Sequence, residues 1–169
     1  MMATVALFFF PFAMALAASS DLLTMRISNK LVLALALGFV IIALAIGMPL
    51  EQFAMHVAAA SVVLVVAFVL FALGWVGGGD AKLSAATTLW LGFALTLPYL
   101  VYAALAGGVL TLVILILRRM PLIPLLARIS WFARLHDRKA GVPYGIALAI
   151  AGLMTYSNSA IFQTLASGS

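Results

Sequence analysis

Carboxylates are the residues of this sequence with the clearest chemical potential, because so few occur. The acidic residues in the chain of 169 are Asp21, Glu51, Asp80 and Asp137. Two carboxylates held close together share a proton, so that one acts as general base and the other as general acid. The chain has no cysteine, which excludes disulfides and thiolate metal sites. His56 and His136 fall in different parts of the predicted topology and form no ligand set, so neither metal nor cofactor is expected.

The composition limits where these carboxylates can lie. Hydrophobic residues make up 67% of the chain and charged residues 8%, whereas an ordinary soluble domain is about 25% charged. Too few polar residues remain to cover a surface in water. The mean hydropathy of +1.29 points the same way. We therefore predict an all-α, polytopic integral membrane protein with a single domain over residues 1–169, and a basic soluble nucleic-acid-binding domain is excluded.

Six apolar segments approach the length of about 20 residues that a membrane helix needs. They cover about residues 2–20, 31–48, 53–76, 81–97, 99–117 and 143–162. Pro49 and Pro98 are predicted to end the second and fourth spans, and Pro143 suits a first helical turn. The basic segment of residues 118–142 lies between the last two spans. Within it, residues 122–135 are expected to form an interfacial amphipathic helix or a substrate-docking surface.

The basic residues orient these spans. Two lie between the first and second spans, one between the third and fourth, and six between the fifth and sixth, which accounts for every Lys and Arg. The positive-inside rule places these loops in the cytoplasm and both termini outside. The net charge of +5 then reflects orientation and contact with anionic lipid, and it needs no nucleic-acid partner.

The same topology separates the four acids. Glu51 falls in a short outside loop, and Asp137 lies in a charged cytoplasmic stretch where solvation or a salt bridge explains it. Asp21 ends the first span and Asp80 starts the fourth, both at the cytoplasmic edge, where an ionisable residue is a functional candidate. Each could instead cap a helix. The glycine triplet before Asp80 is more than a cap needs, and it would let an extended substrate chain pair closely beside the acid.

Three motifs then suggest a family. Gly77, Gly78, Gly79 and Asp80, followed by Ala81-Lys82-Leu83, fit a Gly-x-Gly-Asp-x-Lys-Leu pattern. The stretch from Asp21 to Leu31, which includes Asn29, has Ser28 where that family has proline. Pro143, Tyr144 and Gly145 fit a Pro-Tyr-Gly start of the last span. In this order, the motifs resemble those of the prepilin peptidases, which are aspartic proteases of the intramembrane type.

The resemblance implies an aspartic endopeptidase in which Asp21 and Asp80 activate a water molecule, without saying which is base and which is acid. It also implies motif residues for substrate approach: Gly77, Gly78, Gly79, Lys82, Asn29, Pro143, Tyr144 and Gly145. The implied substrate is a prepilin or pseudopilin, cut between its short basic leader and its hydrophobic helix. That substrate would place the enzyme in the bacterial inner membrane, with its active site at the cytoplasmic face.

The best fit within this family is the short form of the Flp or tight-adherence pilus systems, the TadV or CpaA type. The long forms carry an N-terminal region with paired cysteines that also supports N-methylation. This chain has no cysteine and starts at its first predicted span, so the resemblance implies peptidase activity alone. Archaeal preflagellin peptidases are the alternative within the class. Outside it, the alternatives are a small proton- or cation-coupled transporter and a noncatalytic subunit of a membrane assembly complex.

Overall fold

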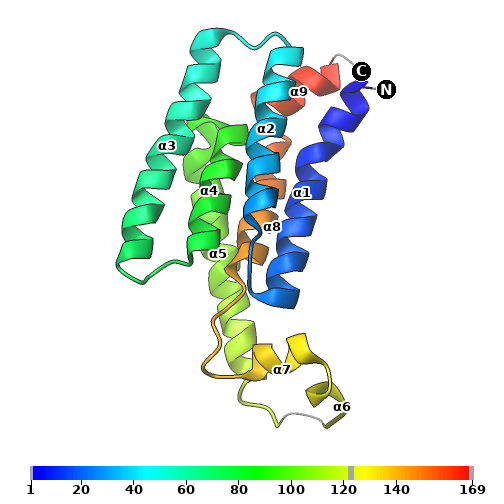
Figure 1. The fold of residues 1–169 in the computed structure, drawn as a ribbon, viewed down its shortest axis with the longest axis vertical. Helices are drawn as coiled ribbons and strands as arrows, with labels where there is room; N and C mark the ends of the chain where they lie inside the picture. Colours follow the sequence, from blue (N-terminus) through cyan, green and yellow to red (C-terminus); the bar gives the residue numbers. More distant parts are fainter. Residues whose placement is uncertain (1, 122–123, 168–169) are drawn as a thin grey trace.

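The structure is a computed structural model that describes residues 2–121 and 124–167, and within these ranges the chain forms helices and no strands. The helices are α1 (Met2–Thr24), α2 (Asn29–Ala45), α3 (Leu50–Ala72), α4 (Gly78–Leu91), α5 (Phe93–Leu117), α6 (Pro124–Ala127), α7 (Ser130–His136), α8 (Tyr144–Tyr156) and α9 (Ala160–Ser167) (Figure 1). The predicted all-α fold is confirmed.

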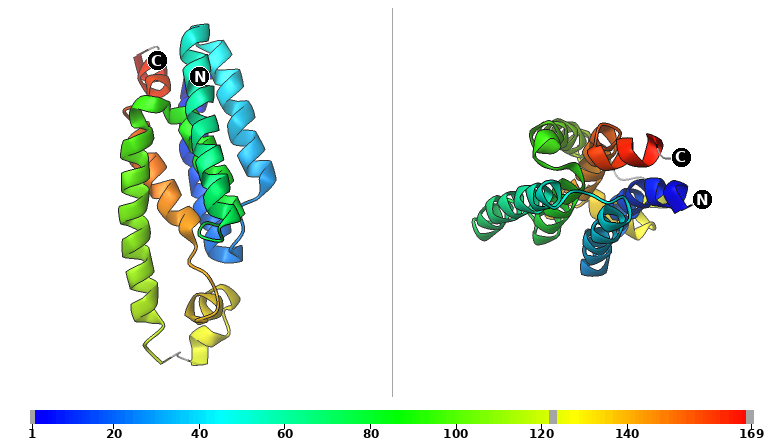
Figure 2. Two further views of the ribbon diagram at one scale, coloured as in Figure 1. Left: turned by 90° about the vertical axis from the view of Figure 1, so that its left-hand side faces the viewer. Right: turned by 90° about the horizontal axis from the view of Figure 1, so that it is seen from above.

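The long helices run up and down a bundle, as two further views show (Figure 2). The connections from α1 to α2, from α3 to α4 and from α5 to α8 lie at one end, together with α6 and α7, whereas both termini lie at the other end (Figure 1). α8 packs against α1, α4 and α5. The three basic loops thus share one end of the molecule, as the distribution of Lys and Arg predicts.

Not all of the predicted spans are long enough to cross a membrane. Val5–Thr24, Leu50–Ala72 and Phe93–Leu117 qualify by length and composition, and α8 with α9 makes a fourth if this pair, bent by 50°, counts as one span. α2 has 17 residues and α4 has 14. All six predicted apolar segments are helical, but the number of six spans is not confirmed.

The break between α4 and α5 lies at Gly92, so the prediction that Pro98 ends the fourth span is wrong. Gly92 has a φ of 71°, a left-handed conformation that glycine adopts readily and other residues avoid. A Cβ atom there would also lie 3.1 Å from the ring of His56. Pro98 lies inside α5, in its second turn, where proline removes the hydrogen bond that residue 98 would donate to the carbonyl of Ala94 without ending the helix.

The segment between α5 and α8 also differs from the prediction of one amphipathic helix over residues 122–135. Its first two residues, Leu122 and Ile123, lie outside the described residues. The remainder forms two short helices, α6 and α7, which are separated at Arg128 and Ile129.

An aromatic cluster in the half of the bundle nearer the termini fixes the helices that carry the acids. Phe10 of α1 stacks on Tyr156 of α8, with ring centroids 4.5 Å apart. The Trp90 ring of α4 lies 5.3 Å from that of Phe10, and its Nε1 donates a 3.0 Å hydrogen bond to the carbonyl of Leu35 in α2. These four residues are all buried in one core, so α1, α2, α4 and α8 are held together.

Candidate active site

Asp21 lies in the last turn of α1, and its side chain is buried, with 5% of its surface exposed. The backbone N–H of Gly145, in the first turn of α8, donates a 2.7 Å hydrogen bond to its Oδ2. N–H groups in a first helical turn have no partner within their helix, and they favour a negative charge. A Cβ atom at Gly145 would lie 2.8 Å from the same Oδ2. Glycine is therefore needed for this approach.

Asp80 lies in the first turn of α4, outside the three candidate spans, and is partly buried. Its Oδ2 packs against the backbone of Gly77, where a Cβ atom would be 2.8 Å away. Burial, and after it the charge of Asp21, raise the pKa of Asp80 to about 7. The two carboxylates are thus close enough to influence each other electrostatically, although they come from segments far apart in the sequence.

Ile27, in the turn between α1 and α2, packs where the two acidic segments and α8 meet. A Cβ atom at Gly79 would lie 3.2 Å from Ile27 Cβ, and one at Gly145 would lie 3.0 Å from Ile27 Cδ1. The turn itself is held by Ser20, whose hydroxyl donates a 2.8 Å hydrogen bond to the carbonyl of Arg26. Ile27 lies within the motif stretch from Asp21 to Leu31, but the sequence alone does not show that it packs against Gly79 and Gly145.

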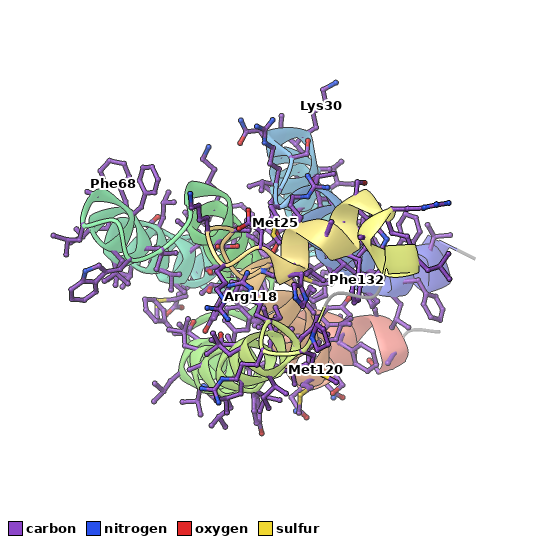
Figure 3. All side chains as sticks on the ribbon, turned by 90° about the horizontal axis from the view of Figure 1, so that it is seen from below. Met25, Lys30, Phe68, Arg118, Met120 and Phe132 are labelled. Carbon is purple, nitrogen blue, oxygen red and sulfur yellow. The ribbon has the colours of Figure 1, made fainter. Side chains whose placement is uncertain are left out.

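A cavity of about 940 Å³ lies over these residues. Its lining comes from the three loops at one end: Asp21, Met25, Arg26, Ile27, Gly74, Trp75, Val76, Gly77, Gly78, Gly79, Asp80, Gly141, Val142 and Tyr144. Seen from that end, Met25 lies near the middle of the face, whereas Lys30 and Phe68 lie at its edge (Figure 3). Of the predicted site residues, the cavity brings together both acids, the glycine triplet and Tyr144. The sequence missed Met25, Arg26 and the exposed Trp75.

The other predicted motif residues lie where helices are joined to one another. Lys82 Nζ donates a 3.0 Å hydrogen bond to Asn29 Oδ1, which joins α4 to the start of α2, and neither residue lines the cavity. Pro143 is buried directly before α8. The Tyr144 hydroxyl donates a 3.0 Å hydrogen bond to the carbonyl of Ala103, which anchors α8 to α5.

The remaining acids and the histidines lie elsewhere. Glu51 is exposed in the first turn of α3, and Asp137 Oδ1 accepts a 2.9 Å hydrogen bond from the backbone of Lys139. His56 is buried, with Nδ1 2.8 Å from the carbonyl of Leu89. Among the described residues, no group of three or more His, Cys, Asp or Glu side chains could hold a metal ion.

The apolar helices indicate a membrane protein, and two of its carboxylates interact within one cavity. The type IV leader peptidase family matches residues 8–112, which is more than half of the chain, and the chain belongs to this family. The matched range contains Asp21 and Asp80 and ends before Pro143. Comparisons with curated proteins and with solved structures find no match. The protein is thus an integral membrane protease of the leader peptidase type, with a prepilin-type substrate.

Proposed function

We propose that this protein is an aspartic endopeptidase that removes the short basic leader from a prepilin or pseudopilin at the cytoplasmic face of the bacterial inner membrane. The single observation that carries the proposal is the meeting of Asp21 and Asp80 in one cavity. That cavity lies at the end of the bundle that holds the basic loops, which is the end the positive-inside rule assigns to the cytoplasm.

The environments of the two acids favour different roles. Burial disfavours the charged form of both carboxyl groups. The Gly145 N–H opposes this effect at Asp21, whereas at Asp80 the charge of Asp21 adds to it, and the pKa of Asp80 is raised to about 7. Asp21 is therefore the proposed general base and Asp80 the proposed general acid, with the proton shared by the pair.

The reaction then proceeds in two balanced steps. Asp21 takes a proton from a water molecule as its oxygen bonds to the scissile carbonyl carbon, and Asp80 gives its proton to the carbonyl oxygen. The tetrahedral intermediate collapses when the carbon–nitrogen bond breaks. The leaving amine takes the proton from Asp21, and the hydroxyl of the intermediate returns a proton to Asp80. The products are the leader with a new carboxyl group and the mature chain with a new amino group.

Gly77 supports extended binding of the substrate. Gly77, Gly78 and Gly79 all line the cavity beside Asp80, but Gly78 and Gly79 already belong to α4, and only Gly77 has extended dihedral angles, φ −70° and ψ 143°. Because Gly77 has no side chain, a substrate strand would pair with the backbone at this position. The hydrophobic helix of the substrate would continue from the cavity into the membrane, and its basic leader would remain in water.

The test is cleavage of a co-expressed prepilin by Asp21→Asn and Asp80→Asn variants. We expect each to lose at least about a hundredfold in cleavage, the scale of general acid–base catalysis. Glu51→Gln and Asp137→Asn make the same chemical change at acids outside the cavity and should cleave at the wild-type rate. Membrane fractionation and circular dichroism would verify that every variant inserts and folds.

Full processing by either aspartate variant would overturn the proposal. Tolerance of both asparagine substitutions would favour a noncatalytic assembly subunit instead. A proton flux that depends on Asp21 and Asp80, with no cleavage, would favour a small transporter.

A further inference from the structure

A second cavity, of about 300 Å³, lies beside the end of α5. It is lined by Leu115, Arg118, Arg119 and Arg138. The first two arginines directly follow the candidate span that ends at Leu117, and Arg138 comes from the segment after α7. No lining residue is shared with the cavity of the acid pair. This arginine pocket is therefore a separate site at the level where a span leaves the membrane.

The guanidinium of Arg118 is fixed by the backbone around it. Its Nε donates a 2.7 Å hydrogen bond to the carbonyl of Leu135, and its Nη2 donates 2.9 Å hydrogen bonds to the carbonyls of Ala140 and Gly141. Its Nη1 has no hydrogen-bond partner among the described residues. Figure 3 shows Arg118 at the end of the molecule where α6 and α7 lie. A cationic group is thus held in one orientation with one nitrogen still available.

The positive charges of the arginine pocket are not neutralised within the described part of the chain. No carboxylate there forms an ion pair with Arg118, Arg119 or Arg138, and the nearby Asp137 accepts its hydrogen bond from the backbone of Lys139. Arg119 and Arg138 are exposed and have no hydrogen-bond partner among the described residues. Three cations without a counter-ion around a small cavity favour a bound anion.

We propose that the arginine pocket binds the phosphate group of an anionic phospholipid. The planar, forked guanidinium group matches phosphate oxygens in a bidentate way. Basic pockets next to the ends of membrane helices suit lipid headgroups, because anionic lipids concentrate there. Leu115, which lines the same pocket, is 48% exposed, and the neighbouring Ile116 is 60% exposed. These side chains lie on the span just above the arginines, where the acyl chains of the same lipid would pack.

Binding there would act on a segment that reaches the other cavity. Arg118 holds the carbonyl of Gly141, and Gly141 and Val142 line the cavity of the acid pair. A bound lipid phosphate would therefore help to hold the guanidinium group of Arg118, which anchors the segment that leads into α8. The proposal concerns binding and does not depend on which reaction the acid pair performs.

The experiment measures lipid binding to the full chain purified in a zwitterionic detergent. Native mass spectrometry would compare phosphatidylglycerol with phosphatidylcholine at equal concentrations. The test variant is Arg119→Gln with Arg138→Gln, which leaves the structural Arg118 in place. The matched control is Arg128→Gln with Lys139→Gln, which removes the same charge from the same segment outside the pocket. Inorganic phosphate would be added as a competitor in a separate arm.

We expect wild-type protein to prefer phosphatidylglycerol, the test variant to lose this lipid by about tenfold or more, and the control to keep wild-type affinity. Equal losses in both double variants would mean that general surface charge attracts the lipid, and the pocket assignment would be wrong. Unchanged binding in the test variant would overturn it as well. If inorganic phosphate competed with phosphatidylglycerol at equal concentrations, the acyl chains would contribute no affinity, and the lipid assignment would fail.

Discussion

Replacing Gly145 with alanine tests whether α8 holds the carboxylate of Asp21, the proposed general base, in place. The new Cβ atom would lie 2.8 Å from Asp21 Oδ2 and 3.0 Å from both Asp21 Cβ and Ile27 Cδ1. All three atoms belong to a packed region, so either the carboxylate or the start of α8 must move. Each movement lengthens or breaks the 2.7 Å hydrogen bond from the Gly145 N–H to Asp21.

The size of the effect follows from that hydrogen bond. A hydrogen bond to a charged group contributes about 1.5–3 kcal/mol. If the lost hydrogen bond stabilises the transition state, each 1.4 kcal/mol of lost stabilisation lowers the rate by about tenfold. We therefore expect kcat/KM to fall by about tenfold to about a hundredfold, while crowding lowers the free energy of unfolding by about 1–3 kcal/mol.

The assay is cleavage of a purified prepilin by the enzyme in proteoliposomes. The matched control is Gly108→Ala on α5, where an added Cβ atom meets nothing within 4 Å, and its kcat/KM should stay within about twofold of wild type. Wild-type kcat/KM in a folded Gly145→Ala protein would refute the reasoning, because Asp21 could then work without its contact to α8.

Three further expectations follow from the same structure. Since the pKa of Asp80 is raised to about 7 and the proposed acid must be protonated, the cleavage rate should fall by about tenfold per pH unit above that value, and a flat pH–rate profile to about pH 9 would contradict the assigned role. Gly107→Ala should slow cleavage, because its Cβ would collide with the ring of Tyr144 and push α8 from α5; wild-type cleavage would show that α8 tolerates this shift. Trp90→Phe should lower the free energy of unfolding by about 1–3 kcal/mol, since it leaves the buried carbonyl of Leu35 without its 3.0 Å hydrogen bond. Thermal unfolding in detergent measures this, and an unchanged midpoint would argue against that bond.

The sequence predicts that Asp21 and Asp80 lie at the same end of the bundle, because this depends only on counting membrane crossings. Asp21 follows the first apolar segment and Asp80 precedes the fourth, so two intervening helices bring the chain back to the same end. The basic residues mark that end independently. The arrangement of the helices agrees, since all three basic loops lie together away from the termini (Figure 1).

Helix lengths were less predictable, because local breaking signals compete. Proline is the stronger helix breaker in general, which made Pro98 the better candidate for the end of the fourth span. The chain turns instead at Gly92, which has a φ of 71° and whose backbone packs against the ring of His56. That contact joins α3 to the end of α4, and a sequence gives no sign of which glycine will meet which ring.

The glycines of the motifs illustrate most clearly what spacing alone leaves out. Gly77, Gly79 and Gly145 all lack the positive φ that would explain a glycine locally. Glycine is needed at these positions because neighbouring atoms lie too close for a side chain. Gly79 and Gly145 both pack on Ile27, and Gly77 and Gly145 each have a carboxylate oxygen beside them. The hydrogen bond from Gly145 to Asp21 spans 124 positions in the sequence. A side chain at Gly79 or Gly145 would push apart the segments that hold the two acids, and one at Gly77 would displace the carboxylate of Asp80 itself. The motif glycines are therefore best understood as packing that sets the separation of Asp21 and Asp80, on which their proposed sharing of a proton depends, rather than as independent turn signals.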